Sequence, residues 1–167
     1  MASMIFRRKR RPGERGAALV EFALVLPLLL VVIAGIVDFA FLFQRYEVIT
    51  NAAREGARLA SLSAPFTYSD AQVNTRVRDY IKAGLNMTDL TPVQPTSGQL
   101  VTVTAVTLDV DAGEATVAVP ARQVTVTYRH TFLLLGPMLA LINGSWGTNM
   151  NLVATSQMRM EVPAAEE

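Results

Sequence analysis

Apolar residues are concentrated in one uninterrupted stretch near the start of the chain, at positions 17–43. Within it only Glu21 and Asp38 carry a charge. As a helix rising about 1.5 Å per residue, the stretch would reach roughly 40 Å, more than the roughly 30 Å hydrocarbon core of a bilayer. The pattern therefore predicts a membrane-spanning helix with residues 22–37 in lipid. The two carboxylates lie toward its ends, where each can reach the headgroup zone or a partner.

The helical pattern continues to about position 62, where it is amphipathic. Its apolar face consists of Ile49, Ala52, Ala53, Gly56, Leu59 and Ala60. Ala52, Gly56 and Ala60 follow one another at intervals of four, a spacing that permits close approach between helices. We expect them to pack, either against the chain's own outer domain or against neighbouring subunits. Pro27, inside the span, predicts a local bend.

The remaining pattern predicts one short helix and an antiparallel sheet. Helical periodicity covers residues 69–83, with Ser69 or Asp70 as the N-cap and Gly84 at the exit. Period-two alternation is found in four segments, at residues 100–110, 114–119, 123–129 and 151–162. Pro120 is expected to break the second of these from the third or to mark a sheet edge. The predicted fold class is α+β: a long N-terminal transmembrane helix extending into a small antiparallel β-sheet domain with one short helix, pilin-like in architecture.

A second apolar segment, residues 132–142, is too short for another span and contains Gly136 and Pro137. Two interpretations stay open, a buried crossover and a loop that lies on the membrane. If the segment is exposed, it offers a docking surface for a partner.

Length and charge divide the chain into three expected parts. These are a basic cytoplasmic leader at 1–16, a long transmembrane and amphipathic helix at 17–62, and an extracytoplasmic α+β domain at 63–167. The formal net charge is +1, but the residues before Ala17 carry +5 and the remainder −4. Because short loops rich in Lys and Arg stay cytoplasmic, we expect a single pass of the cytoplasmic (inner) membrane with the C-terminal domain outside. We do not expect nucleic-acid binding, and the absence of cysteine excludes disulfides.

A short motif precedes the apolar core: Gly16 is followed five residues later by Glu21 and then by Phe22. It resembles the processing site of type IV pilin-like precursors, in which a prepilin peptidase cuts after the glycine. Cleavage would create the α-ammonium of Ala17 on the same helical face as Glu21, four residues away, and so provide a cation for a carboxylate within the span. The terminus of a neighbouring subunit would serve equally. Two alternatives stay open: Glu21 at the cytoplasmic interface of an uncut anchor, and conventional signal-peptide cleavage, although no convincing cleavage site follows the apolar core.

The longer pattern is similar to the TadE-like family. The matching positions are Glu21 with Phe22, Pro27, Asp38 and the run NAAREGAR at residues 51–58. The resemblance implies a small pilin-related protein of the tight-adherence (Flp) pilus machinery. The partners it implies are a prepilin peptidase, other pilins or pseudopilins, the inner-membrane pilus platform and the membrane itself.

Chemistry-bearing residues are sparse. His130 is the only histidine and is interpreted as structural, while Asp109, Asp111 and Glu114 are interpreted as a solvated turn rather than a metal site. We expect no enzymatic activity, no cofactor and no metal. The favoured function is that of a minor pilin or pseudopilin, processed by a prepilin peptidase, that acts in pilus assembly or as a tip or priming subunit. The alternative is an uncleaved single-span scaffold that recruits envelope or secretion-system partners through its outer domain. A membrane-anchored enzyme is the third hypothesis.

Overall fold

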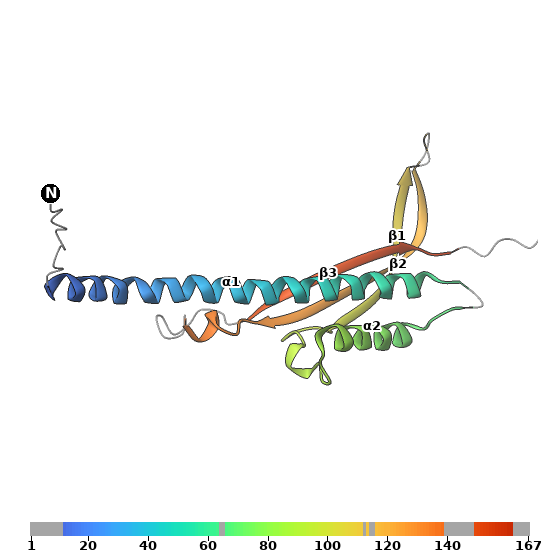
Figure 1. Ribbon diagram of the computed structural model, residues 1–167. Helices are drawn as coiled ribbons and strands as arrows, with labels where there is room; N and C mark the ends of the chain where they lie inside the picture. Colours follow the sequence, from blue (N-terminus) through green and yellow to red (C-terminus); the bar gives the residue numbers. More distant parts are fainter. Residues whose placement is uncertain (1–11, 64–65, 112, 114–115, 139–148, 162–167) are drawn as a thin grey trace, which may run out of the picture.

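One helix dominates the molecule. The structure, a computed structural model, describes residues 12–63, 66–111, 113, 116–138 and 149–161. The C-terminal half of α1 (Pro12–Ser61) lies against a second helix and a three-stranded sheet, and its N-terminal half projects away from this body (Figure 1). The predicted α+β, pilin-like fold is confirmed. Most of the predicted leader, residues 1–11, lies outside the described residues.

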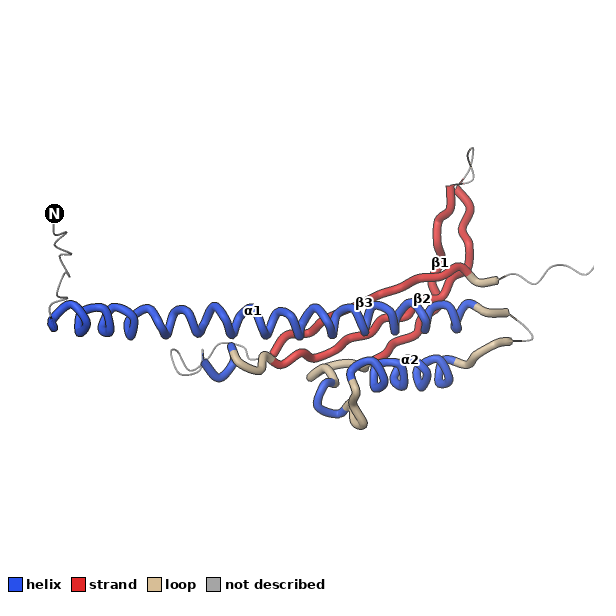
Figure 2. The backbone as a smooth tube through the Cα atoms, viewed as in Figure 1, coloured by secondary structure: helices blue, strands red, loops and turns tan. Residues whose placement is uncertain are grey.

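α1 is a single helix of 50 residues, which corresponds to about 75 Å. It begins five residues before Ala17 and continues through Pro27 without a break (Figure 2). Large apolar side chains are exposed along its N-terminal half, with Leu24 at 78% exposure. The predicted apolar face of the C-terminal half is instead covered by the rest of the chain, and Ile49, Ala52 and Ala53 are almost completely buried.

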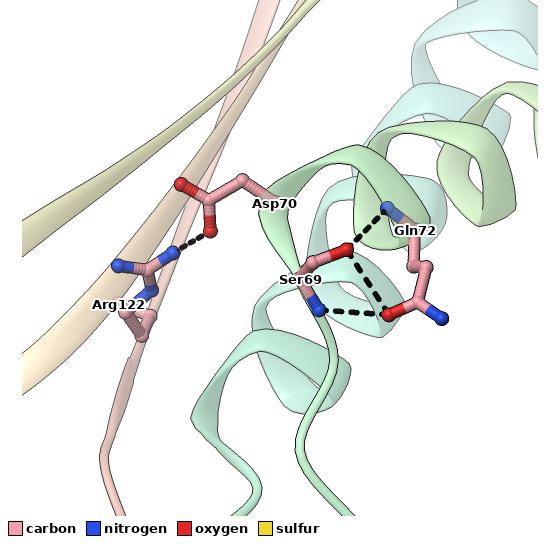
Figure 3. A network of polar contacts seen from close by, with 4 residues as sticks. All are labelled: Ser69, Asp70, Gln72 and Arg122. Carbon is pink, nitrogen blue, oxygen red and sulfur yellow. Dashed lines mark hydrogen bonds and ion pairs between the residues drawn. The ribbon is translucent and has the colours of Figure 1, made fainter.

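The second helix, α2 (Asp70–Leu85), begins at a capping box. The Ser69 hydroxyl accepts a hydrogen bond from the Gln72 amide, and the Gln72 side chain accepts one from the Ser69 amide, so two N–H groups at the helix start are satisfied (Figure 3). Asp70 forms an ion pair with Arg122, which joins the start of α2 to the sheet (Figure 3). Being exposed on the Asp70 side, this pair contributes at most about 1 kcal/mol.

The predicted exit of this helix at Gly84 is wrong. The helix continues to Leu85 and ends at Asn86, which adopts the left-handed conformation with φ of 52°. Gly84 is used for close packing instead, because a Cβ at this position would lie 2.7 Å from Cγ1 of Val48 on α1. A short 3₁₀ turn, η1 (Thr91–Val93), follows.

The sheet is an antiparallel meander in the order β1-β2-β3, formed by β1 (Val101–Asp111), β2 (Thr116–Thr131) and β3 (Asn149–Arg159). β1 pairs with β2 from Val101↔Val126 to Asp111↔Thr116, whereas β3 pairs only with residues 121–131 of β2. The far end of the β1-β2 hairpin therefore has two strands and extends beyond the body (Figure 1).

One of the two sequence interpretations, that Pro120 breaks the strand, is wrong. Pro120 lies inside a continuous β2, opposite Thr107. Its carbonyl accepts a hydrogen bond of 3.0 Å from the Met160 amide, just past the end of β3. Since the N and C=O of one residue in an antiparallel strand point to the same neighbour, the missing N–H of Pro120 also faces this side, where pairing ends. The proline therefore removes the second bond that this residue pair would exchange, so pairing with β3 ends here. Beyond Pro120 this side of β2 is a sheet edge, in agreement with the other interpretation.

The core lies between the sheet and the two helices. α1 packs on β2 and β3, and α2 packs on α1 and β1. Alternate residues of β2 face this core: Val124, Val126, Tyr128 and His130 are buried. Leu152 and Ala154 of β3 add to the same cluster. One face of the sheet is thus covered, and α1 serves both as the projecting helix and as a wall of the core.

Candidate functional site

The predicted processing and assembly residues lie on the projecting half of α1. Gly16, Ala17, Glu21 and Phe22 are all helical and exposed. Glu21 forms no hydrogen bond or ion pair with any side chain in residues 16–63, 66–111, 113, 116–138 and 149–161, the part of the chain whose side chains the structure describes. A carboxylate at the start of an apolar helix is therefore left without a cation from its own folded domain.

The small residues Ala52, Gly56 and Ala60 are packed inside their own chain. Ala52 is completely buried, and a Cβ on Gly56 would lie 2.5 Å from Cγ2 of Val77 on α2 and 3.1 Å from Cγ1 of Val124 on β2. Of the two kinds of packing that the spacing allowed, this is packing against the chain's own domain. Glycine at position 56 lets α1 approach both α2 and the sheet.

Asp38 holds the segment after β2 against α1. Its side chain is 1% exposed, and its two oxygens accept hydrogen bonds from the backbone amides of Leu133, Leu134 and Leu135 at 2.6–3.2 Å. These amides begin a short helical turn at residues 135–138, and the residues before that turn have no side-chain oxygen that could cap it. Asp38 supplies the cap from another helix, and the charge-assisted bonds offset the cost of burying the carboxylate.

The described part of the second apolar segment, residues 132–138, lies beside α1 at the level of Asp38 (Figure 1). Phe132 packs against the core, whereas Leu133 is 65% exposed. Residues 139–142 of the predicted segment lie outside the described residues. This contact between Asp38 and the segment could not be read from the sequence, where the only signal was an isolated acid late in an apolar helix.

A second polar contact lies two turns further along α1. Nη1 of Arg45 donates to Nδ1 of His130 at 2.7 Å. Since a guanidinium only donates, Nδ1 is the acceptor and the neutral ring carries its proton on Nε2. Nε2 is buried and has no acceptor in the described residues, and the Phe132 ring lies edge-on to the imidazole at 5.0 Å. With 1% exposure, this histidine has the environment of a packed core residue.

This environment predicts an acid-sensitive domain. Burial, and next the Arg45 charge, hold the pKa of His130 below its ordinary value near 6.5, while Asp38 acts weakly in the opposite direction. As pH falls through about 6.5, His130 becomes protonated in the unfolded chain but stays neutral in the folded chain. The free energy of unfolding therefore decreases until the pH passes below the folded-state pKa of His130. Thermal unfolding in detergent at about pH 7.5 and about pH 5 should show a larger drop in Tm for the wild type than for His130→Phe. Equal drops would contradict this role for the imidazole.

Taken together, these features define a class of protein: an α+β domain carried on one long, apolar, exposed helix. Of the described helices, α1 alone is long and apolar enough to cross a membrane, and almost none of its most apolar window is buried, unlike the core helix of a soluble protein. The fold is that of a single-pass, pilin-like membrane protein.

The comparison with protein families agrees with this class. Residues 16–58, which form most of α1, match the sequence model of the TadE-like protein family, and the resemblance predicted from the sequence is confirmed. The match associates α1 with a family of Tad (Flp) pilus proteins, which are structural proteins. The matched region contains Glu21, Asp38, Arg45 and Gly56. No curated protein and no solved structure matches the chain.

Proposed function

We propose that this protein is a minor pilin or pseudopilin of a Tad-type pilus that acts in pilus assembly or as a tip or priming subunit. Residues 1–16 form a cytoplasmic leader that a prepilin peptidase removes after Gly16, residues 17–62 span the membrane and enter the outer domain, and residues 63–167 lie outside the cytoplasm. The partners are other pilins or pseudopilins and the inner-membrane platform of the pilus.

The observation that carries this proposal is Glu21, exposed and without a cationic partner among the described side chains, on the projecting half of α1. A carboxylate within an apolar helix costs about 2.5–3.5 kcal/mol on insertion scales. The terminal ammonium of Ala17, or that of a neighbouring subunit, would remove most of this cost. Pairing between subunits would also set the axial register of neighbouring helices during assembly, while Phe22 and the exposed apolar residues beyond it pack against them.

The charge of Glu21 should be required for assembly but not for insertion. Glu21→Leu makes the helix more apolar, so the protein should still reach the membrane, but piliation in a complementation assay should fall about tenfold or more because the subunit contact loses its ion pair. Glu47→Leu is the matched control, since Glu47 is exposed on α1 beyond the apolar segment. Normal piliation with Glu21→Leu would contradict the proposal.

One observation favours a second candidate, an uncleaved single-span scaffold that recruits envelope or secretion-system partners through its outer domain. α1 begins at Pro12 and continues through Gly16 and Ala17, so the bond to be cut lies within helical backbone rather than in an extended segment. In this second function Glu21 lies at the cytoplasmic interface and needs no partner.

A further inference from the structure

A cavity of about 540 Å³ lies where the outer domain meets the apolar half of α1. Two arginines line it, Arg45 from α1 and Arg129 from β2, together with Phe41, Tyr128, Phe132 and Leu133. No aspartate or glutamate lines this cavity in the part of the chain that the structure describes. The cavity therefore combines two positive charges with an apolar wall.

The two guanidinium groups keep most of their donors available. Arg45 donates to His130, and Arg129 donates through Nη2 to the carbonyl of Pro92 at 2.9 Å. Neither arginine has a carboxylate partner among the described residues, and Nε of Arg129 is buried without any acceptor there. Each guanidinium has five N–H donors in a planar fork, and no described carboxylate occupies them, so the two arginines suit an anionic ligand with several oxygens.

The position of the cavity along α1 indicates which anion. If the hydrocarbon core begins at Phe22, directly after Glu21, it ends about 30 Å later near Phe41, and Arg45 lies one turn beyond, at headgroup level. The exposed Leu133 belongs to the segment bound to Asp38 and therefore lies on the lipid side of the arginines. The arginines at headgroup level can bind a phosphate, and the apolar residues on the hydrocarbon side can contact an acyl chain. This arrangement matches the two ends of a phospholipid.

We propose that this cavity, the headgroup site, binds one anionic phospholipid of the leaflet next to the outer domain. The lipid phosphate accepts hydrogen bonds from Arg45 and Arg129, and its acyl chain lies along Phe41, Phe132 and Leu133. The site fixes the height and tilt of the outer domain on the membrane. It depends on α1 spanning a bilayer and is independent of pilus assembly, so either proposal can fail without the other.

Chemical protection of the arginines tests the site on the unaltered protein. The full chain is placed in nanodiscs of phosphatidylcholine with or without phosphatidylglycerol, and the arginines are modified with phenylglyoxal and located by mass spectrometry. We expect Arg45 and Arg129 to react about tenfold more slowly when phosphatidylglycerol is present. Arg54, exposed on the same helix and outside the cavity, should react equally in both. Equal reactivity of Arg45 and Arg129 in the two lipids would overturn the proposal.

Variants and a free anion separate lipid binding from general attraction. In native mass spectrometry from detergent, Arg45→Gln with Arg129→Gln should abolish the preference for phosphatidylglycerol over phosphatidylcholine, and Arg54→Gln should retain it. Inorganic phosphate lacks an acyl chain and should displace the bound lipid poorly at equal concentration. Equal loss of preference in Arg54→Gln would show a nonspecific charge effect, and full displacement by phosphate would show a plain anion site. Either result contradicts the lipid assignment.

Discussion

Replacing Asp38 with alanine is expected to release residues 132–138 from α1. The substitution removes the acceptor for the amides of Leu133, Leu134 and Leu135 and leaves them without a partner in a partly buried site. Each hydrogen bond to a charged group contributes about 1.5–3 kcal/mol to the free energy of unfolding, and the contributions of neighbouring bonds are not additive. We therefore expect Asp38→Ala to lower the free energy of unfolding by about 3 kcal/mol or more. Amide hydrogen exchange of these three residues should accelerate strongly in Asp38→Ala, and the Tm of the outer domain should fall.

Two comparisons distinguish the cap from a general charge effect. Asp38→Asn keeps one acceptor oxygen and the side-chain shape, so its exchange rates should lie between those of the wild type and the alanine variant. Asp109→Asn removes the same charge from an exposed position on β1 and should change neither quantity. If the amide exchange rates of residues 133–135 in Asp38→Ala equalled those of the wild type, contacts other than Asp38 would hold the segment, and the prediction would be contradicted.

Replacing Gly56 with leucine should disrupt the packing of α1 on the outer domain. A Cβ at this position already approaches Cγ2 of Val77 to 2.5 Å and Cγ1 of Val124 to 3.1 Å, and both valines are buried and branched at Cβ. Because these side chains cannot turn away easily, the helix must shift from α2 or from the sheet. We expect a loss of about 3 kcal/mol, the upper end of the usual range for overpacking, measured by denaturant unfolding in detergent.

Gly35→Leu is the matched control on the same helix, because a Cβ there meets nothing within 4 Å. Leucine forms helix better than glycine by somewhat under 1 kcal/mol, so this variant should be as stable as the wild type or slightly more stable. A similar loss in both variants would indicate that glycine at position 56 serves helix flexibility rather than close packing.

Much of the fold follows from local pattern. The apolar stretch predicted the long helix, the periodicity after Ser69 predicted α2, and alternation of Val and Thr predicted the strands. The errors arose where a residue's usual local effect is changed by its neighbours in space. Pro120 stays within β2 because its missing N–H faces the side of the strand where pairing with β3 ends. Gly84 stays within α2, where its lack of a side chain allows close packing against Val48. The helix ends instead at Asn86, which adopts the left-handed conformation.

The candidate site was less predictable because its contacts are distant in sequence. Asp38 and Leu133 are separated by 95 residues, and Arg45 and His130 by 85. A buried acid can be satisfied by a cation, by backbone amides or by another subunit, and the sequence does not distinguish these. The spacing of Ala52, Gly56 and Ala60 has the same ambiguity, since small residues permit close packing with any apolar surface. The structure places α2 and the sheet of the same chain against them.

The N-terminus of the mature protein tests the proposed pilin-type function most directly. The full-length protein is extracted from membranes of cells with and without an active prepilin peptidase, and its intact mass and N-terminal sequence are determined, with Gly16→Val as the control. We expect a chain that starts at Ala17 only when the peptidase is active and Gly16 is present. A chain that keeps its leader under all conditions would contradict processing and favour the uncleaved scaffold.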